Sequence, residues 1–350
     1  MDAYAKRMQD KLEKLYGRDD FVLVAIESSC DETAVSVVRG GEVLSNVISS
    51  QIEIHKRFGG VVPEIASRAH AEAIDNVFAE ALSEAHVGIS EIDAVAVTYG
   101  AGLLGALLVG VAYAKALAYS LDVPLIAVNH VEGHIAANYI TNKELRPPYI
   151  SLLASGGHTE VTLVEEGKIT LLGSTVDDAV GEAFDKAARV LNLPYPGGPE
   201  IEKLAKDGNS NIEFCKSYKN ADNLNFSYSG LKTAVINYVR NREARGEDFS
   251  RADVAASFQA TAVGMLVDAV SRAVKSTGVK TVSVGGGVAA NGYLRESLTK
   301  LSEQENFILY LPEKRLCTDN AAMIAIKAAL DIKNACAHAC DLSLDARPNL

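Results

Sequence analysis

The feature of this chain that most restricts its fold is a strand pattern that occurs twice. Residues 21–50 and residues 149–174 each read as an apolar strand, a short polar turn, a second strand and a third strand. The runs are rich in β-branched residues and are bounded by polar or glycine-containing segments, which is typical of strands joined in hairpins. Helix-rich segments follow each copy. The recurrence predicts a tandem duplication of one α/β unit whose copies have diverged in sequence.

The length of the chain and one proline-rich segment divide it into two parts. A chain of 350 residues is long enough for two domains. The Arg-Pro-Pro segment at 146–148 is typical of a linker, and the strand pattern starts again directly after it. We therefore expect an N-terminal lobe over residues 1–147 and a C-terminal lobe over residues 148–318, the second with additional helices.

The composition indicates a globular protein of a reducing compartment. The 5 cysteines are scattered and form no C-x-x-C pair. The uncharged run Ala94–Ala114 is long enough in principle to cross a bilayer. It separates, however, into an apolar strand, a glycine-containing turn and a helix that continues through Lys115. The N-terminus is polar and contains no apolar core of a signal peptide. We expect a cytoplasmic protein with no membrane span.

The net charge of -11 opposes the binding of a phosphate backbone. Trp is absent and aromatic residues make up only 6% of the chain, so no platform for stacking unpaired bases stands out. A nucleic-acid substrate would need a local basic patch or a partner protein. The basic residues that offer such a patch, if they are not simply a solvated helix face, are Lys216, Lys219, Lys232, Arg240, Arg242 and Arg245.

Two histidines in the segment HVEGH suggest a metal site. His130 and His134 are four residues apart and therefore share one face of a helix. A metalloprotease of the H-E-x-x-H type has its catalytic Glu directly after the first His. Glu132 instead lies about 200° round the helix from His130 and points away from a metal between the histidines. An isolated pair of this spacing is more often structural. Asp319, where a strand gives way to the last helix, is the type of third ligand that would complete a site for Fe(II) or Zn(II).

Glycine-rich turns at strand ends are typical of sites where a phosphate approaches the backbone. The turn SGGHT at 155–159 leaves amides uncovered, although an ordinary hairpin has the same pattern. The stretch SVGGG at 283–287 follows an apolar strand and precedes a helix with Asn291 as its expected cap. The loop PGGP at 196–199 leads into a helix with Glu202 near its start, where a carboxylate binds sugar hydroxyls or only stabilises the helix dipole.

Read in order, these stretches resemble one family. They are similar to the tRNA threonylcarbamoyl-adenosine transferases, formerly called O-sialoglycoprotein endopeptidases, over roughly residues 21–330, and the start SSCDET resembles the bacterial branch. The resemblance implies an α/β fold of the actin-like, sugar-kinase and Hsp70 superfamily. Two RNase-H-like lobes then surround a nucleotide cleft, and the helix at 319–334 joins the first lobe. The matching stretches are ESSCDETAVSVV, NHVEGHIAANY, SGGHTEV, GEAFDKAARVLNLPYPGGPEIEKLA, FSYSGLKTAV, GGVAANGYLRE and CTDNAAMIA.

The resemblance also implies a reaction and partners. In this family a threonylcarbamoyl group moves from threonylcarbamoyl-AMP to N6 of the adenosine just 3′ of the anticodon, in tRNAs that read codons beginning with A. Bacterial members work with a metal-less paralogue and a small P-loop ATPase, while a separate synthase makes the donor.

Site residues follow from the resemblance position by position. His130, His134 and Asp319 match the ligands of one divalent metal per chain, Fe(II) or alternatively Zn(II). Two small departures, Ala154 for Val and GAGL at 100–103 for GPGL, remove no polar group. The residues that match the phosphate- and substrate-binding loop are Leu153, Ala154, Ser155, Gly156 and Gly157, and those that match nucleoside-binding positions are Asp185, Gly198, Glu202 and Asn291.

The chemistry of the implied reaction requires positioning and a proton acceptor. The donor is already an activated anhydride with a good leaving group, whereas the adenine N6 amine is a poor nucleophile. A base is therefore needed as the new bond forms. We expect Asp31, in the first polar turn, to be this base; the alternative is an Asp that only forms the turn. Three other classes remain as alternatives: a small-molecule kinase of the same superfamily, a metalloprotease and a non-catalytic scaffold.

Overall fold

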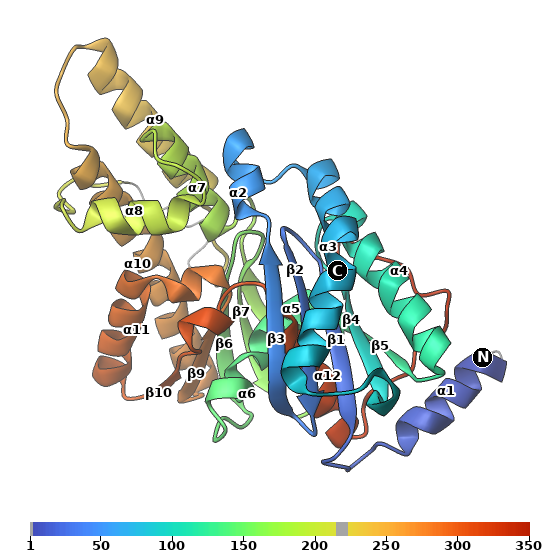
Figure 1. Cartoon of the computed structure of the whole chain (residues 1–350). Coiled ribbons are helices and arrows are strands. Elements are labelled where there is room, and N and C mark those ends of the chain that lie inside the picture. Colours follow the sequence, from blue (N-terminus) through green and yellow to red (C-terminus); the bar gives the residue numbers. More distant parts are fainter. Residues whose placement is uncertain (1–2, 215–222) are drawn as a thin grey trace. The chain divides into compact units, whose positions relative to one another are not determined.

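The computed structural model of the protein describes residues 3–214 and 223–350. The chain packs into two compact units, and Figure 1 shows their elements coloured along the sequence. Unit 1 contains the chain up to Ile54 together with Val61–Lys143 and Asp319–Leu350. Unit 2 contains His55–Gly60 and Glu144–Thr318. The end of the chain therefore packs with its beginning.

The sheet of unit 1 has five strands in the order β3-β2-β1-β4-β5. The first three strands are antiparallel neighbours, whereas β1, β4 and β5 run parallel. The central strand β1 is apolar up to its last residue, Glu27, because both of its faces are buried. The strands are β1 (Val22–Glu27), β2 (Glu32–Arg39), β3 (Glu42–Ser50), β4 (Ala94–Gly100) and β5 (Leu125–Asn129).

The sheet of unit 2 repeats this topology in the order β10-β9-β6-β7-β8. Again the first three strands in sequence are antiparallel, and β6, β9 and β10 are parallel. The tandem duplication predicted from the strand pattern is confirmed, since both copies have the same strand order. The strands are β6 (Tyr149–Ala154), β7 (Thr159–Glu165), β8 (Lys168–Ser174), β9 (Thr281–Gly285) and β10 (Ile308–Tyr310).

Helices cover both faces of the first sheet. Alternate residues of β1 pack on opposite sides: Val24 and Ile26 lie in a core with α3 and α4, whereas Leu23 and Ala25 lie in a core with α12. Helix α3 begins at Pro63, because proline is favoured at a first helical position. The helices with residues in unit 1 are α1 (Ala3–Glu13), α2 (Ile52–His55), α3 (Pro63–Ala85), α4 (Leu104–Leu121), α5 (His130–Ala136), α6 (Asn138–Thr141) and α12 (Ala321–Lys333).

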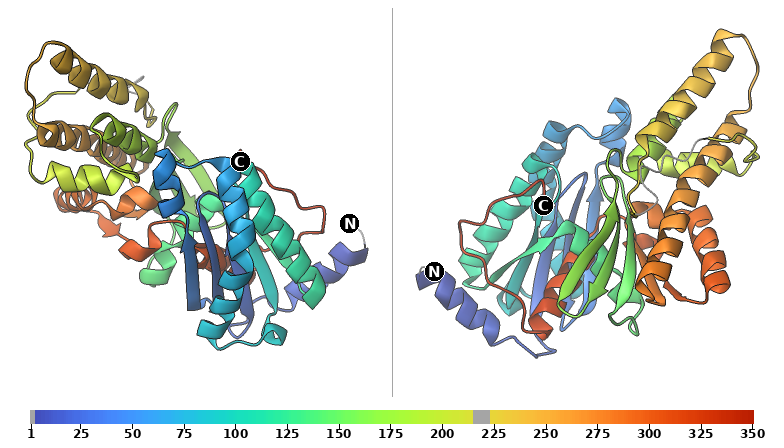
Figure 2. Two further views of the ribbon diagram at one scale, coloured as in Figure 1. Left: turned by 45° about the horizontal axis from the view of Figure 1, so that its top comes forward. Right: turned by 180° about the vertical axis from the view of Figure 1, so that it is seen from behind.

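One long buried helix organises the core of unit 2. Helix α10 runs along the sheet, as the view from behind in Figure 2 shows, and its apolar side chains share a core with β6, β9 and α7. The helices of this unit are α7 (Val180–Val190), α8 (Gly197–Ala205), α9 (Ser229–Ala244), α10 (Arg251–Thr277) and α11 (Gly292–Glu305).

Two helices, α4 and α10, are long and apolar enough to cross a membrane by length and composition alone. The apolar window of α10 is 67% buried within the protein and that of α4 is 33% buried. The expected strand, turn and helix in the uncharged run are present as β4, a turn and α4. Helix α4 also contributes Val111, Ala114 and Leu117 to a core of unit 1, as a core helix does.

The parallel strands determine where functional loops can lie. The carboxyl ends of parallel neighbours meet at one edge of a sheet, and ligands of open α/β sheets bind at that edge. In unit 1 the turn after β1 and helix α5 after β5 share this edge. In unit 2 the loops after β6 and β9 lie at the same edge of their sheet, because the two strands are parallel and Leu153 pairs with Gly285 near their ends.

Candidate functional site

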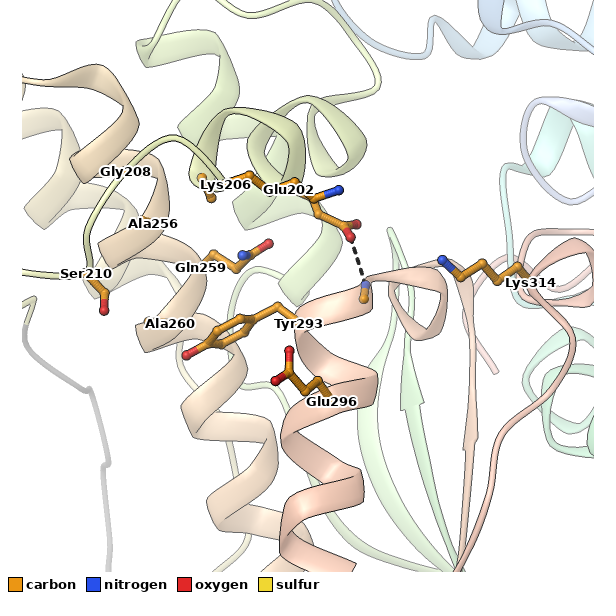
Figure 3. Close-up of a pocket in the computed structure, with 12 residues that line it drawn as sticks. Glu202, Lys206, Gly208, Ser210, Ala256, Gln259, Ala260, Tyr293, Glu296 and Lys314 are labelled. Atoms are coloured by element: carbon orange, nitrogen blue, oxygen red, sulfur yellow. Dashed lines mark hydrogen bonds between the residues drawn. The ribbon is translucent and has the colours of Figure 1, made fainter.

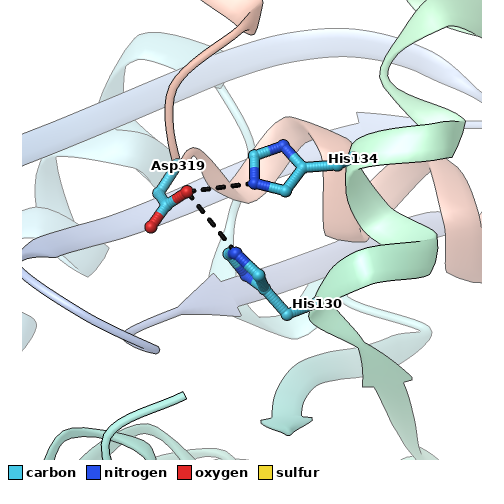
Figure 4. Close-up of side chains that lie close together, drawn as sticks. All are labelled: His130, His134 and Asp319. Carbon is cyan, nitrogen blue, oxygen red and sulfur yellow. Dashed lines mark hydrogen bonds and ion pairs between the residues drawn. The ribbon is translucent and has the colours of Figure 1, made fainter. Parts of the chain in front are cut away.

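Three side chains of unit 1 form a cluster with the chemistry of a metal site. One ligand atom from each of His130, His134 and Asp319 lies within 4.8 Å of the others. Asp319 Oδ1 is 3.1 Å from His134 Nε2 and 3.5 Å from His130 Nε2. Figure 4 shows both rings directed at the same carboxylate. The fold thus brings together residues that are separated by 185 positions in the sequence.

Local capping places two residues of the cluster, His130 and Asp319, at the starts of helices. The side chain of Asn129 accepts a hydrogen bond from Val131 N at 2.8 Å and starts α5. The side chain of Asn320 accepts from Met323 N at 3.1 Å and starts α12. The first ligand is therefore the first residue of α5, and Asp319 is the residue just before the cap of α12.

The electrostatics of the cluster fit a bound cation. A carboxylate oxygen that faces two imidazole nitrogens needs a proton or a metal ion between them, because lone pairs would otherwise repel. Burial alone lowers the pKa of His130, but the carboxylates of Asp319 and Glu27 raise it to about 9. Burial lowers the pKa of His134, which favours its neutral, metal-binding form. Two imidazoles and one carboxylate form a donor set that suits Fe(II) or Zn(II).

Behind His130 lies a buried carboxylate, Glu27, that was not among the predicted site residues. Glu27 ends β1 and is fully buried. Its Oε2 is 3.2 Å from His130 Nδ1. Ser29 Oγ is 3.1 Å from the same nitrogen. In the sequence, Glu27 stands at the end of an apolar strand and opens the matching stretch ESSCDETAVSVV, but neither feature indicates a contact with a histidine.

Two acids, Asp31 and Glu32, lie where the polar turn after β1 leads into β2. Asp31 is buried, and its backbone oxygen accepts a hydrogen bond from Gln51 N at 3.0 Å. Burial, together with the charges of Asp319 and Asp31, raises the pKa of Glu32 to about 10. His70 holds the turn in place, since its ring nitrogens lie 2.7 Å from Thr33 Oγ1 and 3.0 Å from Cys30 O.

Glu132 does not take part in the cluster. Its carboxylate forms an ion pair with Lys327 of α12 at 3.0 Å. The expectation that this residue points away from the histidines is confirmed, and the general base of an H-E-x-x-H protease is missing at that position.

In unit 2 the loop after β6 is open around its glycines. An added Cβ at Gly156 or Gly157 would meet no atom within 4 Å. Ser155 folds the loop back: its N–H donates to His158 O at 2.8 Å, and its Oγ accepts from His158 N at 3.0 Å. Leu153 and Ala154 are buried at the end of β6. The loop therefore exposes backbone at the carboxyl edge of the sheet.

Asp185 and Gly198 lie close together around the PGGP loop. Asp185 Oδ1 accepts a hydrogen bond from Gly197 N at 2.6 Å. A side chain at Gly197 would collide with the α7 backbone, because its Cβ would be 2.7 Å from Asp185 Cα. Gly198 has open space beside it. Asp185 thus fixes this loop at the start of α8.

Glu202 lines a pocket of about 500 Å³, and Asn291 directly precedes two further lining residues, Gly292 and Tyr293 (Figure 3). Glu202 Oε1 accepts a hydrogen bond from Gly292 N at 3.0 Å. Asn291 caps α11 by accepting from Leu294 N at 2.9 Å, and its amide donates to Gln259 at 3.0 Å. Polar side chains that line the pocket are Glu202, Lys206, Gln259, Tyr293, Glu296 and Lys314.

The expected basic patch is only partly described. Lys232 is paired with Asp178 at 2.8 Å, and Arg242 with Glu247 at 2.8 Å. Arg245 is 3.8 Å from the same glutamate, and Arg240 is exposed. Lys216, Lys219 and Cys215 lie outside the described residues. The other four cysteines form no disulfide.

Comparisons with known proteins place the chain in a family. Residues 42–326 match the model of the family described as tRNA N6-adenosine threonylcarbamoyltransferase. A protein of that name from Clostridioides difficile (strain 630) is 53% identical over 334 residues, which is 95% of this chain and 98% of the relative. One from Clostridium perfringens (strain SM101 / Type A) is 54% identical over 332 residues, 94% of this chain and 97% of the relative.

A solved structure agrees with the fold. The HypF of T. kodakarensis superposes with a TM-score of 0.63 at 16% identity, over 91% of this chain and 48% of the HypF chain. This chain thus spans about half of that protein, and the likeness concerns the fold alone. The expected actin-like α/β fold is confirmed. By its sequence relatives and its family match, the chain belongs to the tRNA N6-adenosine threonylcarbamoyltransferase family.

Proposed function

We propose that this enzyme transfers the threonylcarbamoyl group from threonylcarbamoyl-AMP to N6 of the adenosine just 3′ of the anticodon, in tRNAs that read codons beginning with A. The observation that carries the proposal is identity above 50% over nearly the whole chain to proteins named for this transfer. In the reaction a bond forms between N6 and the carbamoyl carbon. The bond from that carbon to the phosphate oxygen breaks, and AMP leaves.

His130, His134 and Asp319 are the residues that would hold the metal, and their convergence within 4.8 Å supports this role. A divalent metal at this position supplies a Lewis acid that polarises an oxygen of the donor. Fe(II) is the proposed ion and Zn(II) the alternative. Asp31 is proposed to accept the proton that leaves N6 as the new bond forms.

Unit 2 is proposed to bind the donor. Backbone amides of the loop Leu153–Gly157 would bind phosphate, which the open space around Gly156 and Gly157 supports. Glu202, which lines the pocket, and Asn291, which directly precedes the lining residue Gly292, would bind the nucleoside, and Asp185 and Gly198 would act at the neighbouring loop. We also propose that the two lobes are residues 1–147, joined by the helix at 319–334, and residues 148–318.

We propose further that the enzyme works in the cytoplasm with two partners of the family, a metal-less paralogue and a small P-loop ATPase. The net charge of -11 supports a tRNA-binding surface that is partly supplied by such partners.

The test of the proposed function is to incubate the purified chain with threonylcarbamoyl-AMP and unmodified tRNA, alone and with the two partners. Mass spectrometry of the digested tRNA should detect N6-threonylcarbamoyladenosine. A parallel incubation with ATP and candidate small acceptors tests the alternative that the protein is a small-molecule kinase. ATP-dependent phosphorylation with no modified tRNA in any mixture would refute the proposal.

Substituting Gly181 with alanine should weaken donor binding. The added Cβ would lie 2.6 Å from Ser155 O and 2.8 Å from Gly156 Cα, and neither backbone atom can move away without shifting the loop. We expect about a tenfold higher KM for threonylcarbamoyl-AMP, the effect of losing about one hydrogen bond. Glu182→Ala, which alters the adjacent residue of α7, is the matched control and should leave that KM unchanged. Equal KM values in both variants would show that this loop does not contribute to donor binding.

Metal affinity should rise with pH. In the metal-free protein the raised pKa of His130, about 9, means that its ring is protonated near neutral pH, so metal binding must displace one proton. The apparent affinity should therefore increase by about tenfold per pH unit below that pKa and level off above it. His134 adds nothing in this range because its pKa is lowered. Competition titrations with a chromophoric chelator check this, and an affinity that is flat between neutral pH and the pKa of His130 would contradict it.

A further inference from the structure

The fully buried carboxylate of Glu27 has no described role in substrate binding. It lies at the end of β1 and contacts His130 through Oε2 at 3.2 Å. We propose that Glu27 is a positioning residue of the metal site: it fixes the proton of the His130 ring on Nδ1, so that the lone pair of Nε2 points at the position shared with Asp319. This inference rests on the proposed metal site and assigns a residue that prepares it.

The surroundings of Nδ1 determine which ring nitrogen carries the proton. A carboxylate oxygen can only accept, so an unprotonated Nδ1 at 3.2 Å would place two lone pairs against each other. Ser29 Oγ, 3.1 Å from Nδ1, can accept from the same N–H. The arrangement therefore selects the tautomer with a proton on Nδ1, which leaves Nε2 as the metal-binding atom.

The carboxylate is itself held rigidly. Ser29 N donates to Glu27 Oε1 at 2.6 Å, and Thr98 Oγ1 donates to Oε2 at 2.5 Å. Across residues 3–214 and 223–350, no Lys or Arg forms an ion pair with Glu27. Burying a carboxylate without a cation beside it is strongly unfavourable. Its charge is thus balanced at the metal site itself and not by an unrelated structural ion pair.

The second histidine provides a contrast within the same site. His134 Nδ1 is buried and has no hydrogen-bond partner among the described residues. Only one of the two imidazoles therefore has a carboxylate behind it. Such partners orient a ligating ring and raise its basicity, and their loss typically lowers metal affinity about 10- to 100-fold. We assign this function to Glu27 for His130 alone.

Glu27→Gln tests the assignment because the amide has nearly the same shape. If its oxygen continues to accept from Ser29 N, its NH2 group faces Nδ1 and forces the proton to Nε2. If the amide is flipped, its NH2 group faces the Ser29 N–H and that bond is lost, while the oxygen that faces Nδ1 is uncharged and a weaker acceptor than the carboxylate, so the ring is held less firmly in either orientation. We expect affinity for Co(II), measured by competition with a chelator, to fall about 10- to 100-fold. We also expect the visible Co(II) spectrum to differ from that of the wild-type protein.

Two controls separate positioning from general destabilisation. Ser36→Ala removes a buried hydrogen bond to Ser45 O in the same sheet, away from the cluster. It should lower Tm and leave Co(II) affinity and spectrum unchanged. In the wild-type protein loaded with Zn(II), ¹⁵N NMR of the histidines should show His130 protonated at Nδ1. This last measurement decides the question even if Glu27→Gln does not fold.

The outcomes are distinct. Wild-type affinity and spectrum in a folded Glu27→Gln protein, or metal bound at His130 Nδ1, would overturn the positioning role but not the metal site. A wild-type protein that binds no Co(II) or Zn(II) through His130 would overturn both. Neither the Co(II) titration nor the NMR measurement uses tRNA or donor, so both results are independent of the transfer assay.

Discussion

Asp319→Ala should lower transfer to tRNA by at least about a thousandfold, because a Lewis acid contributes several kcal/mol to a developing charge and each 1.36 kcal/mol is tenfold in rate. Asp319 is the ligand that contacts both imidazoles, at 3.1 Å and 3.5 Å. Without it, two neutral rings remain and metal retention should fall with activity. Metal per chain, measured by elemental analysis, and modified nucleoside, measured by mass spectrometry, are compared on the same preparation.

The control for this variant is Asp10→Ala, which removes an exposed carboxylate on α1 of the same unit. It should retain wild-type metal content and activity. Circular dichroism should show that both variants are folded, since Asp319 lies outside the apolar cores. If Asp319→Ala lost its metal but kept the wild-type rate, the metal would have no part in the transfer.

For Asp31→Asn we expect a fall in the transfer rate of about 10²- to 10⁴-fold, the usual contribution of a general base, with donor affinity nearly unchanged. Asparagine has the shape of aspartate but cannot accept the N6 proton. Asp31 is buried in the turn that His70 holds through Cys30 and Thr33, so the amide should keep the geometry of the turn. Single-turnover rates with saturating donor, together with donor Kd, separate chemistry from binding.

The matched variant is Asp31→Glu, which keeps a carboxylate and should retain more transfer than Asp31→Asn. Similar losses in both variants, with a weakened donor Kd, would mean that Asp31 shapes the turn and does not act as the base.

Much of the fold could be predicted because its signals are local. Apolar runs with short polar turns indicated the strands in both copies, and Pro63 marked the start of α3. The same pattern of strands and turns occurs in both halves of the sequence, and the two sheets accordingly have the same strand order. The start of helix α11 was also predictable, since Asn291 is a strong N-cap and indeed accepts from Leu294 N.

Less of the candidate site could be predicted, because its residues come together from distant parts of the sequence. The spacing of His130 and His134 predicts one face of a helix, but only the fold brings Asp319 to that face, because α12 returns to the first sheet. Glu27 could not be selected, since nothing local to β1 indicates a histidine from α5 beside its end. Long-range convergence of this kind depends on strand order and not on spacing.

The residues of unit 2 that we propose to bind the donor were predicted for their polar groups, and not for their bonds within the protein. Sequence patterns predict polar groups near a glycine-rich loop, but they do not reveal bonds within the protein. Asp185 bonds to Gly197 N and Glu202 bonds to Gly292 N, so each also stabilises a loop at a helix start. Substitutions of either residue will therefore combine effects on ligand binding with effects on local structure.

The most direct measurement of metal-assisted transfer is a titration of metal-free enzyme with Fe(II), and separately with Zn(II), in the presence of threonylcarbamoyl-AMP, unmodified tRNA and both partners. Bound metal and N6-threonylcarbamoyladenosine are quantified at each step. Transfer should rise in proportion to bound metal and reach its maximum at one ion per chain, and His134→Ala should abolish the rise. Full transfer by the metal-free enzyme, or a maximum unrelated to occupancy of this cluster, would contradict the account.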